Sequence, residues 1–183
     1  MRVPPTPEPA EYDAPQHRQQ TLYFNELFQL KVACEYIRLY RGRLARWVTR
    51  LNVLRAVASS GAIATWAVVQ SHPLVWGGII AAAQVSDVLR DAIPLAARHK
   101  AASALATSLD ALFIEALFEW EGVFAGQLSD REITERWQHL MQRQLDAQRE
   151  HFPDDNLPER PDLMALAEQH AISYFQTRFG PQE

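Results

Sequence analysis

The stretch that decides the fold is residues 56–86, AVASSGAIATWAVVQSHPLVWGGIIAAAQVS, thirty-one consecutive residues without a charged side chain. The pair His72-Pro73 divides this stretch near its middle. The sequence therefore predicts two apolar helices joined by a turn. Such a hairpin is stable either across a lipid bilayer or in the core of a helical bundle. The residues on either side of it indicate which of these two environments applies.

The two halves of this hairpin, which we place at about residues 51–89, differ in length. Residues 51–70 match the roughly 20 residues that a helix needs to cross the hydrocarbon core of a bilayer. The second half begins at Pro73, and only thirteen uncharged residues separate that proline from Asp87. We expect the second half to be tilted or packed against protein rather than surrounded by lipid.

Basic and aromatic residues lie on both sides of the hairpin. Residues 18–100 contain eleven Lys or Arg against four Asp or Glu, whereas residues 101–183 contain six against fifteen. The turn at residues 70–73 has no Lys or Arg, so the positive-inside rule predicts that both ends of the hairpin face the cytoplasm. The expected anchors at the lipid surface are Arg46, Trp47, Arg50, Arg55, Arg90, Arg98 and Lys100.

Small and polar residues recur inside the hairpin at helical spacing. Small residues four positions apart let two helices approach closely, and polar groups in a lipid-facing helix are costly unless they turn toward protein or water. These residues predict contacts between helices, or the lining of a lumen, in a homo-oligomer. The residues are Ser60, Ala64, Thr65, Gly77, Gly78, Ala81, Gln84 and Asp87.

The segments around the hairpin predict further helices. Residues 1–17 are rich in proline and acid and predict a flexible tail, and residues 18–127 form the helical domain that contains the hairpin. Within that domain, helices are expected at about residues 19–50 and 95–124, with apolar stripes that suit antiparallel packing. Residues 128–183 predict two cytoplasmic helices, the first of which starts at a capping box formed by Ser129 and Glu132.

No catalytic signature occurs in the chain. Cys34 is the only cysteine, which excludes an internal disulfide and a cysteine zinc cluster. Glu135 and His139 share a helix face but lack a second histidine or cysteine at matching spacing. A glycine-rich phosphate loop, a nucleophile elbow and an H-E-x-x-H motif are also missing. We therefore expect a protein that is not an enzyme and needs no cofactor or metal.

Three segments together resemble the SLATT family, the two-transmembrane effector domains associated with bacterial SMODS and SLOG conflict systems. They are EYIRLYRGRLARWVTRLNVLRAVASSGAIATWAVV, VWGGIIAAAQVSDVL and ARHKAASALATSLDALFIEAL, and the resemblance covers roughly residues 25–125. It implies an antiviral effector that multimerises in the bacterial inner membrane. An upstream sensor of infection or of a nucleotide signal would trigger it to open a pore or disrupt the membrane.

A soluble all-helical interaction or adaptor protein is the alternative. In that case the alanine-rich hairpin would form the central pair of a five- or six-helix cytoplasmic bundle, which agrees with the mean hydropathy of -0.23. Arginine interleaved with Tyr36, Tyr40 and Trp47 is also compatible with nucleic acid. The adjacent apolar run makes lipid the favoured partner of these residues.

Overall fold

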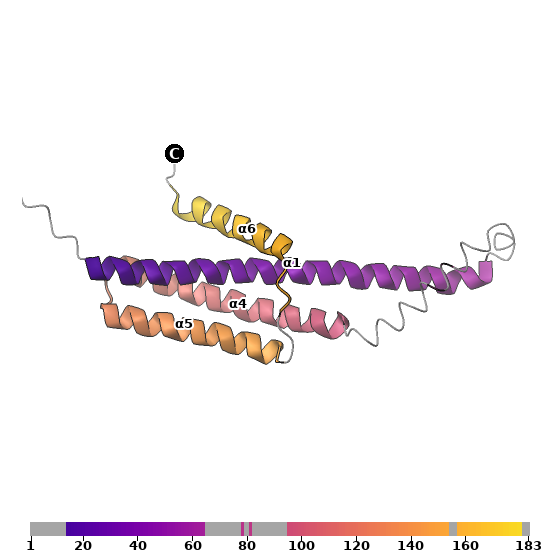
Figure 1. Ribbon diagram of the computed structural model, residues 1–183, viewed down its shortest axis with the longest axis horizontal. Helices are drawn as coiled ribbons and strands as arrows, with labels where there is room; N and C mark the ends of the chain where they lie inside the picture. The colour runs from indigo at the N-terminus through magenta and orange to yellow at the C-terminus, as the bar shows by residue number, and fades with distance from the viewer. Residues whose placement is uncertain (1–13, 65–77, 79–80, 82–94, 154–156, 181–183) are drawn as a thin grey trace, which may run out of the picture.

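The computed structural model describes residues 14–64, 78, 81, 95–153 and 157–180, and every regular element in these ranges is helical (Figure 1). The all-α prediction is confirmed. The helices are α1 (Ala14–Ala64), α4 (Leu95–Phe124), α5 (Asp130–His151) and α6 (Pro161–Phe179).

Helix α1 is a single rod of 51 residues, about 75 Å long at 1.5 Å per residue. The sequence predicted a basic helix and a separate span that starts at residue 51, but the structure joins them without interruption. The reason is that no proline occurs between residues 15 and 73. The helix also begins at Ala14, inside the predicted tail, because Pro15 is tolerated in the first turn of a helix. Residues 1–13 lie outside the described part of the chain.

The core forms where α1 and α4 pack antiparallel, as the apolar stripes predicted. On α1 the stripe is buried from Tyr23 to Leu44, and on α4 it is buried from Ala102 to Val123. The largest fully buried side chains come mainly from these two helices. They include Tyr23, Leu27, Leu30, Ile37, Leu105 and Leu109.

Helix α5 returns along α4 after a tight turn. Gly126 has a φ of +66°, a conformation that glycine adopts without steric cost, and it ends the preceding helix. The predicted capping box is present: the Ser129 backbone N–H donates to Glu132 Oε2 at 2.8 Å, and the Ser129 side chain accepts from the Glu132 N–H. Ile133 and Leu140 are the buried residues of α5.

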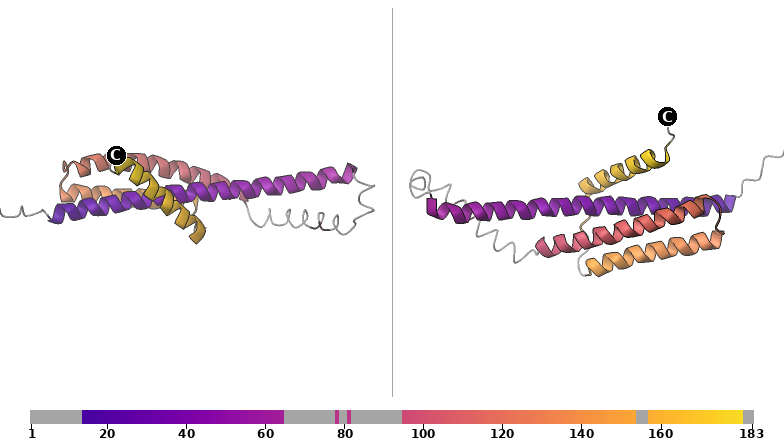
Figure 2. Two further views of the ribbon diagram at one scale, coloured as in Figure 1. Left: turned by 90° about the horizontal axis from the view of Figure 1, so that it is seen from above. Right: turned by 180° about the vertical axis from the view of Figure 1, so that it is seen from behind.

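Helix α6 lies across α1 on the side away from α5 (Figures 1 and 2). Phe175 anchors it, with ring contacts to Phe24 and Phe28 of α1 and to Phe113 of α4. At the other end of α6, Asp162 pairs with Arg43 of α1 at 2.8 Å. The C-terminal helix therefore closes the bundle over the α1/α4 pair.

The C-terminal third of α1 projects beyond the bundle. Figures 1 and 2 show α1 continuing well past the start of α4. Leu44 is the last buried residue of α1, whereas Trp47 and Val53 are 51% and 56% exposed. Two apolar side chains of α1 beyond Leu44 are thus largely exposed.

The soluble alternative placed the hairpin at the centre of the bundle, and most of the hairpin lies outside the described residues. The described core consists of side chains from α1, α4, α5 and α6 up to Leu44 on α1. Of the hairpin, the structure describes backbone up to Ala64 together with Gly78 and Ala81, and these last two are exposed. The described bundle consists of α1, α4, α5 and α6, and the position of the hairpin relative to it stays a prediction.

Among the described residues, α4 is the one helix long and apolar enough to cross a membrane. Of its most apolar 18-residue window, 39% is buried inside the protein. The core helix of a soluble protein has the same composition. The packing of α4 against α1 buries one face of this helix and leaves Ile114 and Phe118 exposed.

Candidate functional site

Basic residues of α1 and α4 lie near the point where α1 leaves the bundle, and we call this group the basic belt. Four of the predicted membrane anchors are in it with described side chains: Arg46, Arg50, Arg98 and Lys100. Trp47 lies between the two arginines of α1, and the Arg50 guanidinium carbon is 6.0 Å from the centroid of its ring. This combination of arginine and an exposed indole is typical of the interface between lipid and water.

The antiparallel register of α1 and α4 brings the two halves of the belt together. Arg38 of α1 pairs with Asp110 of α4, with 2.8 Å between Nη2 and Oδ1. Continued along both helices, this register places residue 98 level with residue 50. Arg98 and Lys100, which lie about 50 residues from Arg46 and Arg50 in sequence, therefore reach the same level of the bundle.

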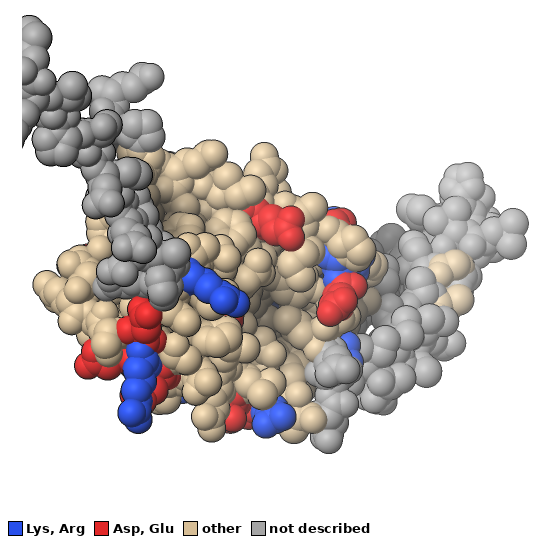
Figure 3. Space-filling view, turned by 60° about the vertical axis from the view of Figure 1, so that its left-hand side comes forward, with Lys and Arg blue, Asp and Glu red and all other residues tan. Residues whose placement is uncertain are grey.

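Acidic side chains are missing from this part of the sequence. Residues 36–86 contain no Asp or Glu, and neither do residues 95–109. The opposite end of the bundle differs, because acidic and basic side chains are interspersed there among uncharged surface (Figure 3). The two acid-free stretches thus both lie next to the basic belt.

The remaining predicted site residues are only partly described. Arg55, Ser60 and Ala64 lie on the projecting part of α1, and their side chains are not described. Arg90 and four residues of the predicted interface or lumen lie outside the described residues. Those four are Thr65, Gly77, Gln84 and Asp87.

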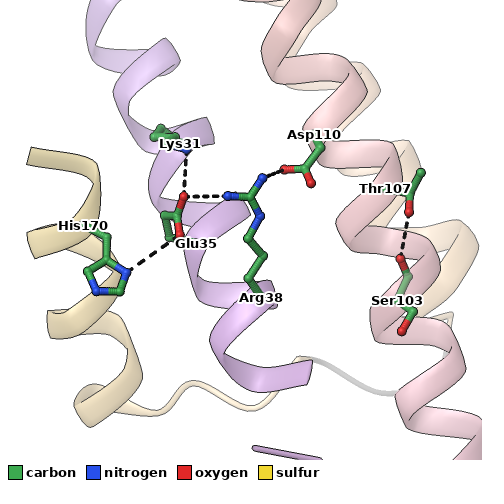
Figure 4. Close-up of polar contacts among 7 residues, drawn as sticks. All are labelled: Lys31, Glu35, Arg38, Ser103, Thr107, Asp110 and His170. Atoms are coloured by element: carbon green, nitrogen blue, oxygen red, sulfur yellow. Dashed lines mark hydrogen bonds and ion pairs between the residues drawn. The ribbon is translucent and has the colours of Figure 1, made fainter. Parts of the chain in front are cut away.

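A second polar feature links three helices inside the bundle (Figure 4). Lys31 Nζ lies 2.7 Å from Glu35 Oε1, and both side chains are largely buried, at 8% and 14% exposed. Arg38 Nη1 lies 2.9 Å from the same oxygen and so connects Glu35 to Asp110 of α4. From α6, His170 Nδ1 approaches Glu35 Oε2 at 3.8 Å. We call Lys31, Glu35, Arg38, Asp110 and His170 the charge cluster.

The electrostatics of the charge cluster favour an ionised Glu35. Burial on its own would raise the pKa of this carboxyl group. The hydrogen bond from Lys31, and the positive charges of Lys31, Arg38 and His170, outweigh burial and hold the pKa below its ordinary value. The cluster therefore stabilises the docking of α4 and α6 onto α1 at neutral pH.

The sequence analysis did not identify the charge cluster. Lys31 lies beside the buried Leu27 and Leu30, at a position where lysine is normally excluded. Its ammonium group is covered by two rings, with 4.3 Å to the centroid of Tyr174 and 5.1 Å to that of Phe113. The available signal was a Lys-Glu pair four residues apart within the apolar stripe, but its partners on α4 and α6 are visible only in the fold.

The described residues form no obvious catalytic centre. No group of three His, Cys, Asp or Glu residues among them is placed to hold a metal ion. Glu135, considered above with His139, pairs with Arg131 at 2.8 Å. Burial raises the pKa of the Cys34 thiol to about 12, so this cysteine is a poor nucleophile at neutral pH.

No known family model, curated protein or solved structure matches this chain. Its class follows from the fold and the site alone. The chain is an all-helical protein, and in its described residues α1, α4, α5 and α6 form a bundle from which α1 extends past the basic belt.

Proposed function

We propose that the protein is a membrane-anchored effector. The hairpin at about residues 51–89 inserts into the bacterial inner membrane, and both termini remain in the cytoplasm with the bundle. One observation carries this proposal: α1 runs uninterrupted from the core, through an acid-free basic belt with an exposed tryptophan, into the charge-free stretch. A projecting apolar helix with basic and aromatic residues at its base is the arrangement that a bilayer stabilises.

The effector acts as a homo-oligomer that opens a pore or otherwise disrupts the membrane. The small and polar residues of the hairpin support this step, because they allow close helix packing and turn polar groups away from lipid. On the resemblance to SLATT domains we assign this activity to an antiviral conflict system, downstream of a protein that senses infection or a nucleotide signal. The bundle provides the cytoplasmic surface on which such a partner would act.

Membrane insertion is tested by fractionation and by cysteine accessibility. In a Cys34→Ala background, Ser71→Cys reports on the predicted turn and Gln127→Cys on the bundle, where Gln127 is exposed. We expect the protein to stay in the membrane pellet after carbonate extraction. A membrane-impermeant maleimide should label Ser71→Cys in intact spheroplasts, and Gln127→Cys only after permeabilisation.

The soluble adaptor gives the opposite result. A monodisperse protein in buffer without detergent, with both cysteines protected in intact cells, would contradict membrane insertion. Pore formation is tested separately by dye release from vesicles that contain the purified protein. If the protein inserts into the membrane but causes neither dye release nor cellular toxicity, the proposal of a membrane anchor stands and the proposal of a pore is refuted.

A further inference from the structure

The side of α4 that faces away from α1 carries a row of exposed residues, which we call the outer stripe. It lies on the opposite side of the helix from the buried Leu105, Leu109 and Leu112. Ile114 and Phe118 are its largest apolar members, at 55% and 70% exposed. Every residue of the stripe is exposed except one alanine that is half-buried. The members are Ala97, Lys100, Ala104, Thr107, Ala111, Ile114, Phe118 and Glu121.

The spacing of the outer stripe is that of a coiled-coil seam. Its residues are alternately three and four positions apart, the pattern by which two helices interlock over several turns. The other helices contact different sides of α4: Arg143 of α5 pairs with Glu115, and Phe175 of α6 contacts Phe113. The stripe therefore lacks a partner helix within the described part of the chain. Exposed large apolar side chains on such a seam indicate an interaction surface.

The outer stripe is complementary in size to a reversed copy of itself. The order of its three- and four-residue steps reads the same from either end, so two antiparallel copies match residue for residue. Its N-terminal half contains mainly alanine, and its large apolar residues lie in the C-terminal half. Reversal therefore places Ala104 opposite Ile114 and Lys100 opposite Phe118. A parallel pair would instead place Phe118 against Phe118 and leave gaps between the alanines, where packing contacts are lost.

The charges of α4 favour the same antiparallel arrangement. Residues 95–109 contain Arg98 and Lys100 and no Asp or Glu, whereas residues 110–124 contain four Asp or Glu and no Lys or Arg. Antiparallel pairing brings the basic half of each copy against the acidic half of the other, and parallel pairing brings like charges together. It also puts Lys100 over the face of the Phe118 ring, where a cation is stabilised.

We propose that the outer stripe of α4 binds a second copy of this chain in the antiparallel orientation. The two-fold axis lies at the level of Leu109, midway between Ala97 and Glu121. The interface is isologous, so the contact between Lys100 and Phe118 occurs twice. The charge and size complementarity of α4 with itself identifies the partner as this chain.

Pairing of this kind competes with membrane insertion, and this step alone rests on the proposed function. Reversal points the projecting part of α1 in opposite directions in the two copies (Figure 1). Their two hairpins therefore cannot enter one bilayer side by side. The second copy also covers Lys100 of the basic belt. The pair thus holds chains that have not yet inserted, and the chains separate before they assemble in the membrane.

Disulfide formation between two forms of the full chain tests the orientation. In a Cys34→Ala background, one form carries Ala104→Cys and the other carries Ile114→Cys, with tags of different length. The purified forms are mixed in nonionic detergent, where hairpins at opposite ends of a pair occupy separate micelles, and oxidised with copper phenanthroline. We expect a disulfide between the two forms. Neither form should link to itself, because identical residues lie about 15 Å apart along an antiparallel pair, beyond the roughly 7 Å between Cα atoms that a disulfide spans.

Two matched variants locate the contact on the outer stripe. Phe118→Lys in both forms should lower the fraction of the mixed disulfide about tenfold, because it places a lysine against Lys100 of the second copy. Phe124→Lys changes a phenylalanine that is 75% exposed on the same helix but lies outside the stripe, and it should leave this fraction unchanged. Circular dichroism establishes that both variants are folded.

The same oxidation in membranes separates the pair from its competition with insertion. Co-expressed forms in carbonate-washed membranes should give no mixed disulfide, and its presence there would retain the pair and refute the competition. Failure of the hairpin to insert would leave the result in detergent unaffected. Disulfides within each form but not between the two would establish a parallel pair and overturn the antiparallel one. No disulfide in any combination would overturn the pair, and labelling of Phe118→Cys by a photoactivatable lipid would then assign the outer stripe to the bilayer.

Discussion

The ammonium nitrogen of Lys31 on α1 lies 4.3 Å from the centroid of the Tyr174 ring on α6. A cation that would otherwise be costly in the core is thus paired with Glu35 and covered by an aromatic face of another helix. The contact explains why an isolated lysine is tolerated inside the apolar stripe. It also makes the docking of α6 depend on a specific ring.

The first prediction distinguishes the contribution of the aromatic ring of Tyr174 to stability from the contribution of its size. Tyr174→Phe retains the aromatic face and should change the free energy of unfolding by less than about 0.5 kcal/mol. Tyr174→Leu removes the aromatic face and should lower the free energy of unfolding by about 1–2 kcal/mol, the range for a desolvated cation–π contact. Chemical denaturation of the full chain in nonionic detergent, followed by circular dichroism, measures both. Equal effects of the two substitutions would show that the ring contributes only by packing.

The second prediction concerns Glu35 and acid. Because its pKa is lower in the folded chain than in the unfolded one, the stabilisation is complete above the ordinary value near 4.5. It is lost as pH falls through the folded-state pKa. Lys31, Arg38, Asp110 and His170 are the charged or titratable groups of the cluster around Glu35.

We therefore expect Glu35→Gln to lower the melting temperature at pH 7 and to reduce its fall between pH 5 and pH 3. Thermal unfolding at a series of pH values measures this slope. Glu121→Gln, at an exposed position on α4, is the control and should keep the slope of the unmodified chain. An unchanged slope in Glu35→Gln would mean that other carboxyl groups determine the acid response.

Local patterns in the sequence predict most of the helical architecture. The stripe on α4, the capping box at Ser129 and the end of α6 at Gly180 each depend on residues within a few positions of one another. The continuity of α1 is less visible, because the change from basic to apolar composition near residue 51 indicates a boundary that the backbone does not have. Composition describes the surroundings of a helix and does not determine where it ends.

The candidate functional residues also differ in whether the sequence alone could identify them. Arg46 and Trp47 were predicted from their proximity to the charge-free stretch, and the fold adds only that Arg98 lies at the level of Arg50. The charge cluster depends on the placement of α4 and α6 around α1. Contacts such as Lys31 with Tyr174 span more than 140 residues, and no spacing rule within one segment predicts them.

The third prediction uses the basic belt to test orientation. Arg46→Glu combined with Arg50→Glu replaces two positive charges at the cytoplasmic end of the hairpin with two negative ones. Each arginine is worth about 1 kcal/mol near an anionic surface and acidic residues contribute little to orientation, so loss of the two positive charges should shift the ratio of the two orientations roughly thirty-fold. The labelled fraction of Ser71→Cys in intact spheroplasts reports this ratio and should decrease.

The control is Arg131→Glu, which lies on α5 and is 89% exposed. This variant reverses one charge at a position outside the basic belt, and it should leave the labelling of Ser71→Cys unchanged. If the double variant labels like the unmodified chain, the belt does not orient the hairpin.

The last prediction tests the small-residue face of the second half of the hairpin. Gly77→Leu combined with Gly78→Leu adds two branched side chains where close helix packing would require none. If this face joins subunits, the variant should enter the membrane normally but migrate as a smaller species in detergent. It should also lose toxicity on expression. The matched control is Val75→Leu with Ile79→Leu, which keeps the apolar character of the same segment and leaves both glycines in place. Oligomers and toxicity that survive Gly77→Leu with Gly78→Leu would show that subunits meet elsewhere, and the exposed residues Ile114 and Phe118 of α4 would then be the next surface to test.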